Sequence, residues 1–483
     1  MAQPARLILL LHAHLPYIRH PEYDNFLEEI WLFEAISETY LPLLRVLSGL
    51  ERDGVDAPLA ISLSPTLLLM LEDELLRNRY RAFMERQKEL AERELERTSG
   101  DPAFEPLARM YHQRVADNIA DFERYEGHIA RQFDLLQKRG RLELLTCPGT
   151  HPYLPLFEGK PQAVHAQVQA GLDTYSRSFG SLPRGMWLPE CGYTPALEPA
   201  LREHGIEYTV LAAHGILLSG DPPPTGTFAP VQLPGGLHAF PRDVLSARQV
   251  WNPDDGFPAH ADYRDFYRDI GYDLPLDYVG PYIHPYVHDE SIRTTTGFKY
   301  WAITGRTSEK LPYEPEKARD RVREHARRFI EEQAAQLRDV REVLPDQPLV
   351  VTAPFDAELF GHWWLEGIDW IDQLSRQIAG SDDLQLASPG RVLDSLSAFP
   401  QVDAQFSSWG TKGYSEVWLD GKNDWIYRHL HKAVQRMSEL CERFPDQDGL
   451  KKRALDQAAR EVLLAQGSDW PFIMRGDASV SYA

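Results

Sequence analysis

The segment Leu349-Val-Val-Thr-Ala-Pro-Phe-Asp-Ala-Glu-Leu-Phe-Gly-His-Trp-Trp364 combines the pattern of a strand with a group of polar and aromatic residues. It begins with a short apolar run rich in β-branched side chains, which is typical of a buried parallel strand. The run then delivers an acid, Asp356, into a turn rich in aromatic residues and histidine. Because α/β proteins carry their chemistry at the carboxyl ends of parallel strands, this pattern predicts an active site at Asp356. Taken alone, the segment fits equally well an aspartate that caps the following helix.

Other short apolar runs predict further strands, and each of them is followed by polar or turn residues. They lie at 7–11, 59–64, 142–146, 206–211 and 385–388. The long series of helix formers between the second and third of these runs exceeds an ordinary strand connection, so we assign a helical insertion to residues 66–139. From residue 401 onward the pattern is again mainly helical. The sequence therefore predicts an α/β fold with two helical additions.

Residues 219–285 are poor in periodic pattern and rich in Pro, Gly, Asp and Tyr, which is typical of a functional lid or binding wall. Within them, Tyr263-Arg-Asp-Phe-Tyr-Arg-Asp-Ile-Gly-Tyr272 offers arginines and rings suited to sugar hydroxyls, although a plain surface helix explains it equally well. The chain has 11 Trp and 21 Tyr, and several of them lie beside acids. This pattern favours a carbohydrate ligand, but cores and protein interfaces are also rich in Trp and Tyr.

Composition excludes several classes of partner. Acidic residues exceed basic ones by 72 to 51, the net charge is -21, and no Lys/Arg-rich block offers a surface for nucleic acid. The three cysteines lack CxxC spacing, which argues against a disulfide framework or a zinc ribbon and favours the reducing cytoplasm. The first apolar run is too short for a signal peptide, and no stretch approaches the roughly 20 apolar residues of a membrane span. We expect a cytoplasmic monomer without nucleic-acid or membrane partners.

Two further motifs carry candidate site residues. His12 and His14 lie two positions apart after a predicted strand, so their side chains share one face. They fit metal ligands, hydrogen-bond donors to a substrate, or histidines whose partners are backbone carbonyls. Glu190 lies between Pro189 and a Cys-Gly pair, so we expect a bent backbone that aims its carboxyl group away from the sheet.

Five stretches together resemble glycoside hydrolase family 57, in the order that the family has. They are His12-Ala-His-Leu-Pro16, the segment 147–154, Trp187-Leu-Pro-Glu-Cys-Gly-Tyr193, Ala353-Pro-Phe-Asp-Ala-Glu-Leu-Phe-Gly-His362 and the loop 409–425. Within that family the chain is most similar to the 1,4-alpha-glucan branching enzymes, especially in Ser407-Ser-Trp-Gly410 and Ala465-Gln-Gly-Ser-Asp-Trp470. The resemblance implies an incomplete (β/α)7 barrel made of residues 1–65 and 140–398, and a C-terminal helical domain, 399–483, that adds aromatic residues to the active site.

The resemblance also implies the reaction and the residues that carry it. We expect the enzyme to cleave alpha-1,4-glucan and to transfer the chain to a 6-hydroxyl by a retaining double displacement, with glucan donor and acceptor chains and without metal or cofactor. Glu190 is implied as the nucleophile and Asp356 as the general acid/base. The implied substrate-site residues are His12, His14, His151, Arg264, Trp409, Trp418 and Asp469.

This mechanism needs two carboxyl groups roughly 5–5.5 Å apart, one ionised and one protonated. We expect Asp356 to hold the proton, because the apolar side chains of Phe355, Phe360 and Trp363 and the charge of Glu190 would raise its pKa. Phe257 stands where we expect relatives to carry a loop tyrosine, which would favour hydrolysis over transfer. The chain also ends at Ala483, where we expect relatives to continue.

Three alternatives stay open. The nearest is an alpha-amylase-type hydrolase of the same fold. A second is a metal-dependent carbohydrate deacetylase or mannosidase-like enzyme, in which His12, His14 and Asp356 bind zinc. The third is a glucan-binding scaffold without activity, built on Trp409, Trp418 and Trp425.

Overall fold

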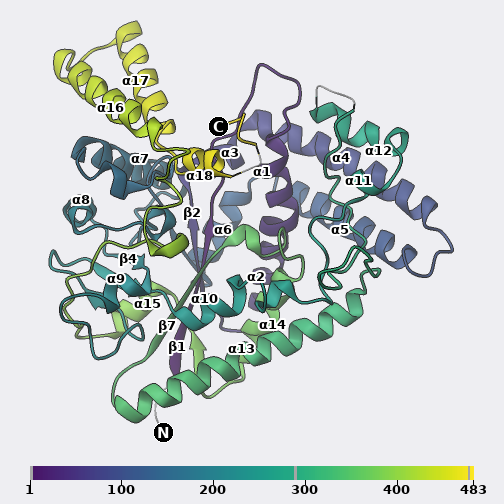
Figure 1. The fold of residues 1–483 in the computed structure, drawn as a ribbon, viewed down its shortest axis with the longest axis horizontal. Helices are drawn as coiled ribbons and strands as arrows, with labels where there is room; N and C mark the ends of the chain where they lie inside the picture. Colours follow the sequence, from purple (N-terminus) through teal and green to yellow (C-terminus); the bar gives the residue numbers. More distant parts are fainter. Residues whose placement is uncertain (1–3, 288–290, 477–478) are drawn as a thin grey trace.

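The computed structural model describes residues 4–287, 291–476 and 479–483. Its main sheet is built around β1 (Ala5–Ala13), which pairs in parallel with three neighbours (Figure 1). These are β2 (Leu59–Leu63), β7 (Val350–Asp356) and β8 (Leu384–Leu386), and β2 also pairs with β3 (Leu142–Leu145). In register, His12 of β1 lies opposite Ser62 of β2 and Asp356 of β7. The predicted strands are confirmed, and their carboxyl ends bring distant polar residues to one edge.

A smaller sheet continues the arrangement. It contains β4 (Tyr208–Leu211), β6 (His238–Pro241) and β5 (Val231–Gln232), with β6 parallel to β4 and antiparallel to β5. Single parallel bridges join the two sheets, and they link Thr146 with Met186, Gly185 with Tyr208, and Arg242 with Thr352. The pairings therefore run from β1 through β2, β3, the segment 185–186, β4, β6 and β7 back to β1. This order agrees with the expected seven-membered (β/α) arrangement, with single bridges at three of its junctions.

Helices pack around the sheet and contact one another in the series α10, α13, α14, α2, α6, α7, α8. Their bounds are α10 (Val244–Trp251), α13 (Pro315–Val343), α14 (Gly367–Ala379), α2 (Leu41–Arg52), α6 (Ile129–Lys138), α7 (Pro161–Phe179) and α8 (Glu198–Glu203), with α15 (Pro389–Ser395) following β8. Every residue of β2 and β4 is buried, as expected for strands covered on both faces. Each buried leucine contributes roughly 1.5–3 kcal/mol, so these strands form a rigid base for the site.

The helical segment between β2 and β3 is divided more finely than its pattern predicts. It contains α3 (Pro65–Glu72), α4 (Glu74–Arg97), α5 (Glu105–Arg124) and α6. Asp73 separates the first two helices, because its side chain caps α4 by accepting a hydrogen bond of 3.0 Å from the backbone N–H of Leu76. Glu126 and Gly127, both with positive φ, separate α5 from α6.

The N-terminal and C-terminal helical segments flank the sheet edge that carries the polar residues. The first consists of α1 (Glu29–Ala35), a π-helical turn η1 (Ile36–Tyr40) and α2. The second consists of α16 (Trp425–Arg443), α17 (Gly449–Leu464) and α18 (Asp469–Arg475). Figure 1 shows α16 and α17 as a yellow-green hairpin that projects from the body, whereas α18 lies beside the strands.

Residues 219–285 hold more regular structure than their composition predicts, namely β5, β6, α10, α11 (Ile270–Asp273) and α12 (Leu276–Ile283), after the short α9 (Ala213–Leu217). Phe257 is 2% exposed, and its ring stacks on His325 at 4.6 Å near Trp370, so it packs in the core. In the described part of the chain, no helix is long and apolar enough to cross a membrane. Residues 1–3, which belong to the expected leaderless N-terminus, lie outside the described residues.

Candidate active site

Glu190 lies in a strained turn. It is the middle residue of η3 (Pro189–Cys191), and its φ is 63°, followed by a φ of 50° at Cys191. Non-glycine residues adopt this left-handed region at a cost of about 1–3 kcal/mol, and such positions gather at functional sites. The predicted bend at Glu190 is therefore present.

Two donors from the C-terminal part of the chain fix the Glu190 carboxyl group. The indole Nε1 of Trp409 donates a hydrogen bond of 2.8 Å to Oε2, and the hydroxyl of Ser468 donates one of 3.0 Å to Oε1. The backbone N–H of Trp409 also donates to the carbonyl of Glu190 at 2.9 Å. Both carboxyl oxygens accept hydrogen bonds, an arrangement that suits an oriented carboxylate.

Asp356 is the last residue of β7, and it differs from Glu190 in its contacts. Among the described residues, no group donates a hydrogen bond to its carboxyl oxygens. Its neighbour Glu358 accepts a hydrogen bond from the hydroxyl of Tyr40. Asp356 is thus left free to exchange a hydrogen bond with a bound molecule.

Burial raises the pKa of both candidate carboxyl groups. The pKa of Glu190 rises to about 7, through burial and the charges of Asp356 and Asp469, against the hydrogen bonds from Trp409 and Ser468. The pKa of Asp356 rises to about 6 through burial, while Arg242 and His14 act in the opposite direction. The charge of Asp356 acts on Glu190, as expected of two acids at one site.

The expected cause of the Asp356 shift needs a correction. The Trp363 ring is 51% exposed and does not bury Asp356, and in the free site Glu190 has the higher pKa. The pKa of Asp356 is raised by burial, and the charge of Glu190 is not among the causes of that rise.

The histidines form a hydrogen-bonded chain that ends on Glu190. His12 and His151 are buried, and burial lowers the pKa of both well below the ordinary value, so both are neutral. Their Nε2 atoms are 2.8 Å apart, and Nδ1 of His151 is 2.8 Å from the Ser468 hydroxyl. Because Ser468 donates to Glu190, it accepts from His151, and His151 then accepts from His12. This series of hydrogen bonds fixes one tautomer for the imidazole ring of His12 and one for that of His151.

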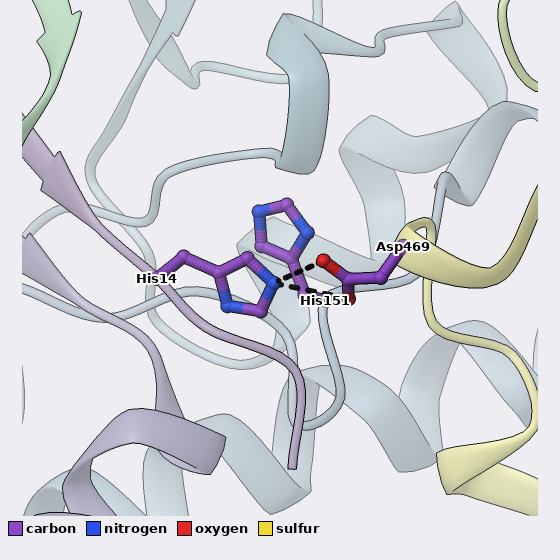
Figure 2. Close-up of side chains that lie close together, drawn as sticks. All are labelled: His14, His151 and Asp469. Atoms are coloured by element: carbon purple, nitrogen blue, oxygen red, sulfur yellow. Dashed lines mark hydrogen bonds and ion pairs between the residues drawn. The ribbon is translucent and has the colours of Figure 1, made fainter. Parts of the chain in front are cut away.

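His14 makes a separate ion pair. Its Nε2 is 3.1 Å from both carboxylate oxygens of Asp469, the first residue of α18 (Figure 2). Burial alone would lower the pKa of His14, but the Asp469 carboxylate raises it above its ordinary value. Figure 2 also shows the His151 ring beside that of His14; the two rings are stacked at 3.6 Å with an angle of 13°. The ion pair of His14 and Asp469 therefore lies directly after the end of β1, beside the His151 ring.

His14, His151 and Asp469 could in principle hold a metal ion, since their ligand atoms lie within 4.8 Å of one another. Imidazole lone pairs lie in the ring plane, and the stacked planes of His14 and His151 do not converge on a common point. Both nitrogens of His151 are also engaged, by His12 and Ser468. This geometry favours hydrogen bonding to a ligand over zinc binding.

The remaining predicted site residues fall in three different environments. Trp409 contacts Glu190 directly. Trp418 is 1% exposed and stacks on Tyr153 at 4.3 Å, so it supports the Trp409 loop and presents no surface to a substrate. Arg264 is 2% exposed and donates a hydrogen bond of 2.7 Å to the carbonyl of His362. The structure therefore does not bring Arg264 and Trp418 into contact with the two acids.

Sequence reasoning missed two residues of the site. Arg242 follows β6, lies over the Trp409 ring at 5.2 Å and lowers the pKa of Asp356. It was missed because the four-residue strand before it, which ends in proline, has no clear alternation. Ser468 lies inside the quoted motif Ala465-Gln-Gly-Ser-Asp-Trp470, but nothing in its spacing indicated a bond to Glu190.

A sequence model described as glycosyl hydrolase family 57 matches residues 8–266, more than half of the chain. The chain belongs to glycosyl hydrolase family 57. A second model, described as the C-terminal part of 1,4-alpha-glucan branching enzymes, matches residues 429–483. The two matched regions of this family 57 chain meet at the site, because Glu190 of the first is hydrogen-bonded to Ser468 of the second.

Similar proteins cover the chain almost completely. A 1,4-alpha-glucan branching enzyme of Thermococcus kodakarensis is 31% identical over 99% of this chain and 71% of its own length. The crystal structure of the alpha-amylase AmyC from Thermotoga maritima is 39% identical, with a TM-score of 0.91 over 99% of this chain and 90% of that one. The structure of a family 57 branching enzyme from Pyrococcus horikoshii is 32% identical, with a TM-score of 0.86 over 99% and 87% of the two chains.

Proposed function

We propose that this family 57 protein is a 1,4-alpha-glucan branching enzyme. It cleaves an alpha-1,4 linkage and transfers the released donor segment to a 6-hydroxyl, with retention at the anomeric carbon. The match of the C-terminal region to branching enzymes and the two similar branching enzymes support this proposal. The observation that carries the chemistry is Glu190, whose two oxygens are oriented by Trp409 and Ser468 and whose pKa responds to Asp356.

In the first step, the Glu190 carboxylate attacks the anomeric carbon while Asp356 gives its proton to the O4 atom of the departing chain. The hydrogen bonds from Trp409 and Ser468 stabilise the ionised form of Glu190 and aim it. Asp356 has no hydrogen-bond donor among the described residues, so its proton is available to the glycosidic oxygen. The step leaves a glycosyl ester on Glu190 and an ionised Asp356.

In the second step, Asp356 removes the proton of an acceptor 6-hydroxyl, which attacks the anomeric carbon and releases Glu190. Attack by water at this stage gives hydrolysis instead of a branch. We propose that His12, His14, His151 and Asp469 bind the hydroxyl groups of the glucosyl unit at the two acids. This role is supported by Nδ1 of both His12 and His14, which is buried and has no hydrogen-bond partner in the described structure.

The test uses linear amylose, whose complex with iodine loses absorbance when long chains are shortened. The product is treated with a debranching enzyme and its chain lengths are profiled, with reducing ends counted before and after. A branching enzyme yields new short chains only after debranching. Linear fragments with a matching rise in reducing ends would contradict the proposal.

An alpha-amylase-type hydrolase is the second candidate. The 39% identity to AmyC, described as an alpha-amylase, favours it, and both reactions use the same glycosyl ester. The same amylose experiment separates the two candidates through the ratio of new branches to new reducing ends.

We propose alpha-glucan chains as both donor and acceptor, and the cytoplasm as the place of action. The cytoplasmic location is supported by the cysteines, because Cys147, Cys191 and Cys441 form no disulfide bond. We also propose that residues 399–483 act as one wall of the site, since Trp409 and Ser468 both belong to that range.

A further inference from the structure

Trp363 is an exposed indole in the loop that follows Asp356. It lies seven positions after Asp356, and its side chain is 51% exposed, whereas the adjacent Trp364 is 1% exposed. Its backbone N–H donates a hydrogen bond of 3.3 Å to the carbonyl of Glu358, two positions after Asp356. An indole held open to solvent beside a catalytic loop exposes apolar surface that a ligand can cover.

One face of Trp363 is occupied by a supporting ring. Phe266 stacks on it with ring centroids 4.3 Å apart and an angle of 25°. The Lys299 ammonium lies 4.0 Å from the centroid of Phe266. Since the indole and the ammonium both lie this close to one ring, they occupy its opposite faces. Because the Trp363 side chain is half-exposed although Phe266 covers one of its faces, the exposed surface lies on the opposite face of the indole.

The stacked pair of Trp363 and Phe266 packs on a buried lysine. Lys299 is 1% exposed, and the carboxylates of Glu38, Asp269 and Glu34 act on it. Cation–π and ring–ring contacts both stabilise the stack, so Lys299 holds Phe266 in position.

The loop that presents Trp363 is also fixed. Gly361 has a φ of 101°, and a Cβ atom there would lie 1.9 Å from the carbonyl oxygen of Glu38. Nδ1 of His362 forms a bond of 2.5 Å with the Glu38 carboxylate, and the N–H of Gly361 donates to the carbonyl of Trp364 at 2.7 Å. These contacts hold the loop 361–364 against η1, so the indole of Trp363 is preorganised for binding.

We propose that the open face of Trp363 is a stacking subsite for the glucan chain on the leaving-group and acceptor side of the cleaved bond. This inference rests on the proposed function. Asp356 acts on the departing O4 atom and then on the acceptor hydroxyl, so the loop that continues from Asp356 borders that side and not the side of Glu190. The apolar C–H face of a glucosyl unit covers the flat indole, which orders the acceptor chain and lets it compete with water.

The test compares three variants of the full-length protein acting on amylose. Trp363→Tyr keeps an aromatic face, whereas Trp363→Leu keeps apolar packing on Phe266 but has no flat face. Trp251→Ala is the matched control, because this tryptophan is 42% exposed at the end of α10, outside the site. Thermal unfolding of each variant establishes that it is folded.

Trp363→Leu is expected to raise the KM for amylose about 10-fold, the effect of losing one aromatic contact worth about 1.4 kcal/mol, with a smaller effect on kcat. The fraction of cleavage events that end in hydrolysis should also rise, whereas Trp363→Tyr should stay within about 3-fold of the unchanged protein. An unchanged KM and an unchanged transfer fraction in Trp363→Leu would overturn the subsite.

The two proposals fail in different ways. If the unchanged protein makes no branches but Trp363→Leu still raises the KM for glucan hydrolysis, the proposed function falls and the stacking subsite stands. If the unchanged protein makes branches and Trp363→Leu behaves like Trp251→Ala, the subsite falls and the proposed function stands.

Discussion

The indole of Trp409 donates a hydrogen bond of 2.8 Å to the carboxyl group of Glu190, although 219 positions separate the two residues. This bond ties the C-terminal region to the strained turn at η3, and it acts on the ionisation of Glu190 by lowering its pKa against the effect of burial. The C-terminal helical segment is therefore part of the chemistry, and changes within it should alter the pH dependence of the reaction.

Trp409→Phe removes this hydrogen bond but keeps most of the ring. The pKa of Glu190 should rise further above about 7, because burial then acts with one donor fewer. Because Glu190 has the higher pKa of the two acids, the basic limb of kcat/KM against pH should move to higher pH by about one unit, which corresponds to a hydrogen bond of about 1.4 kcal/mol, and the maximum of kcat/KM should fall. Trp418→Phe is the control, since Nε1 of Trp418 has no partner in the described structure. Equal shifts in both variants would contradict this account of the bond.

The unchanged protein should have a bell-shaped pH profile. The reaction needs one carboxyl ionised and the other protonated, and the pKa values of the pair are raised to about 7 and about 6. Below about pH 6 both carboxyl groups are protonated, and above about pH 7 both are ionised, so kcat/KM declines on both sides. Rates with amylose between pH 4 and pH 9 check this, and a plateau extending to pH 9 would be inconsistent with the need for one protonated carboxyl group.

Asp469→Asn should lower the pKa of His14. Burial opposes a charge on His14, and the Asp469 carboxylate at 3.1 Å is the main group that offsets it. Without that charge the imidazole should titrate below its ordinary value, which an NMR titration of the labelled ring measures. Glucan binding should weaken at the same time. A His14 pKa that stays above the ordinary value in the variant would exclude the ion pair as its cause.

Much of the fold followed from the sequence because buried parallel strands carry a strong apolar signal, as at 7–11 and 59–64. Asp356 was singled out for the same reason, because it follows such a run, whereas Glu190 was singled out by the bend expected between Pro189 and the Cys-Gly pair. Trp418 was misplaced because a tryptophan in a glycine-rich loop looks the same in sequence whether it faces a ligand or Tyr153. Arg242 was missed because short strands such as β6 acquire their structure from tertiary pairing and carry little local pattern.

Gly361→Ala should destabilise the loop after Asp356. A side chain there would meet the Glu38 carbonyl at 1.9 Å in a backbone conformation that favours glycine, so we expect a loss of about 3 kcal/mol or more in the free energy of unfolding. Gly54→Ala is the matched control, since its φ is also positive, at 73°, but nothing lies within 4 Å of the added atom. Chemical denaturation compares the two. Similar losses in both variants would show that backbone strain, and not the contact with Glu38, dominates.

The roles of the two acids can be read from the product that each alanine variant makes with azide and alpha-maltosyl fluoride. In Glu190→Ala, azide takes the place of the missing nucleophile and attacks once, so the product should be beta-maltosyl azide. In Asp356→Ala, Glu190 attacks first and azide then releases the ester, so the product should be alpha-maltosyl azide. NMR of the anomeric proton distinguishes the two. The reverse assignment of anomers, or full activity of Glu190→Ala without azide, would contradict a double displacement through Glu190 and Asp356.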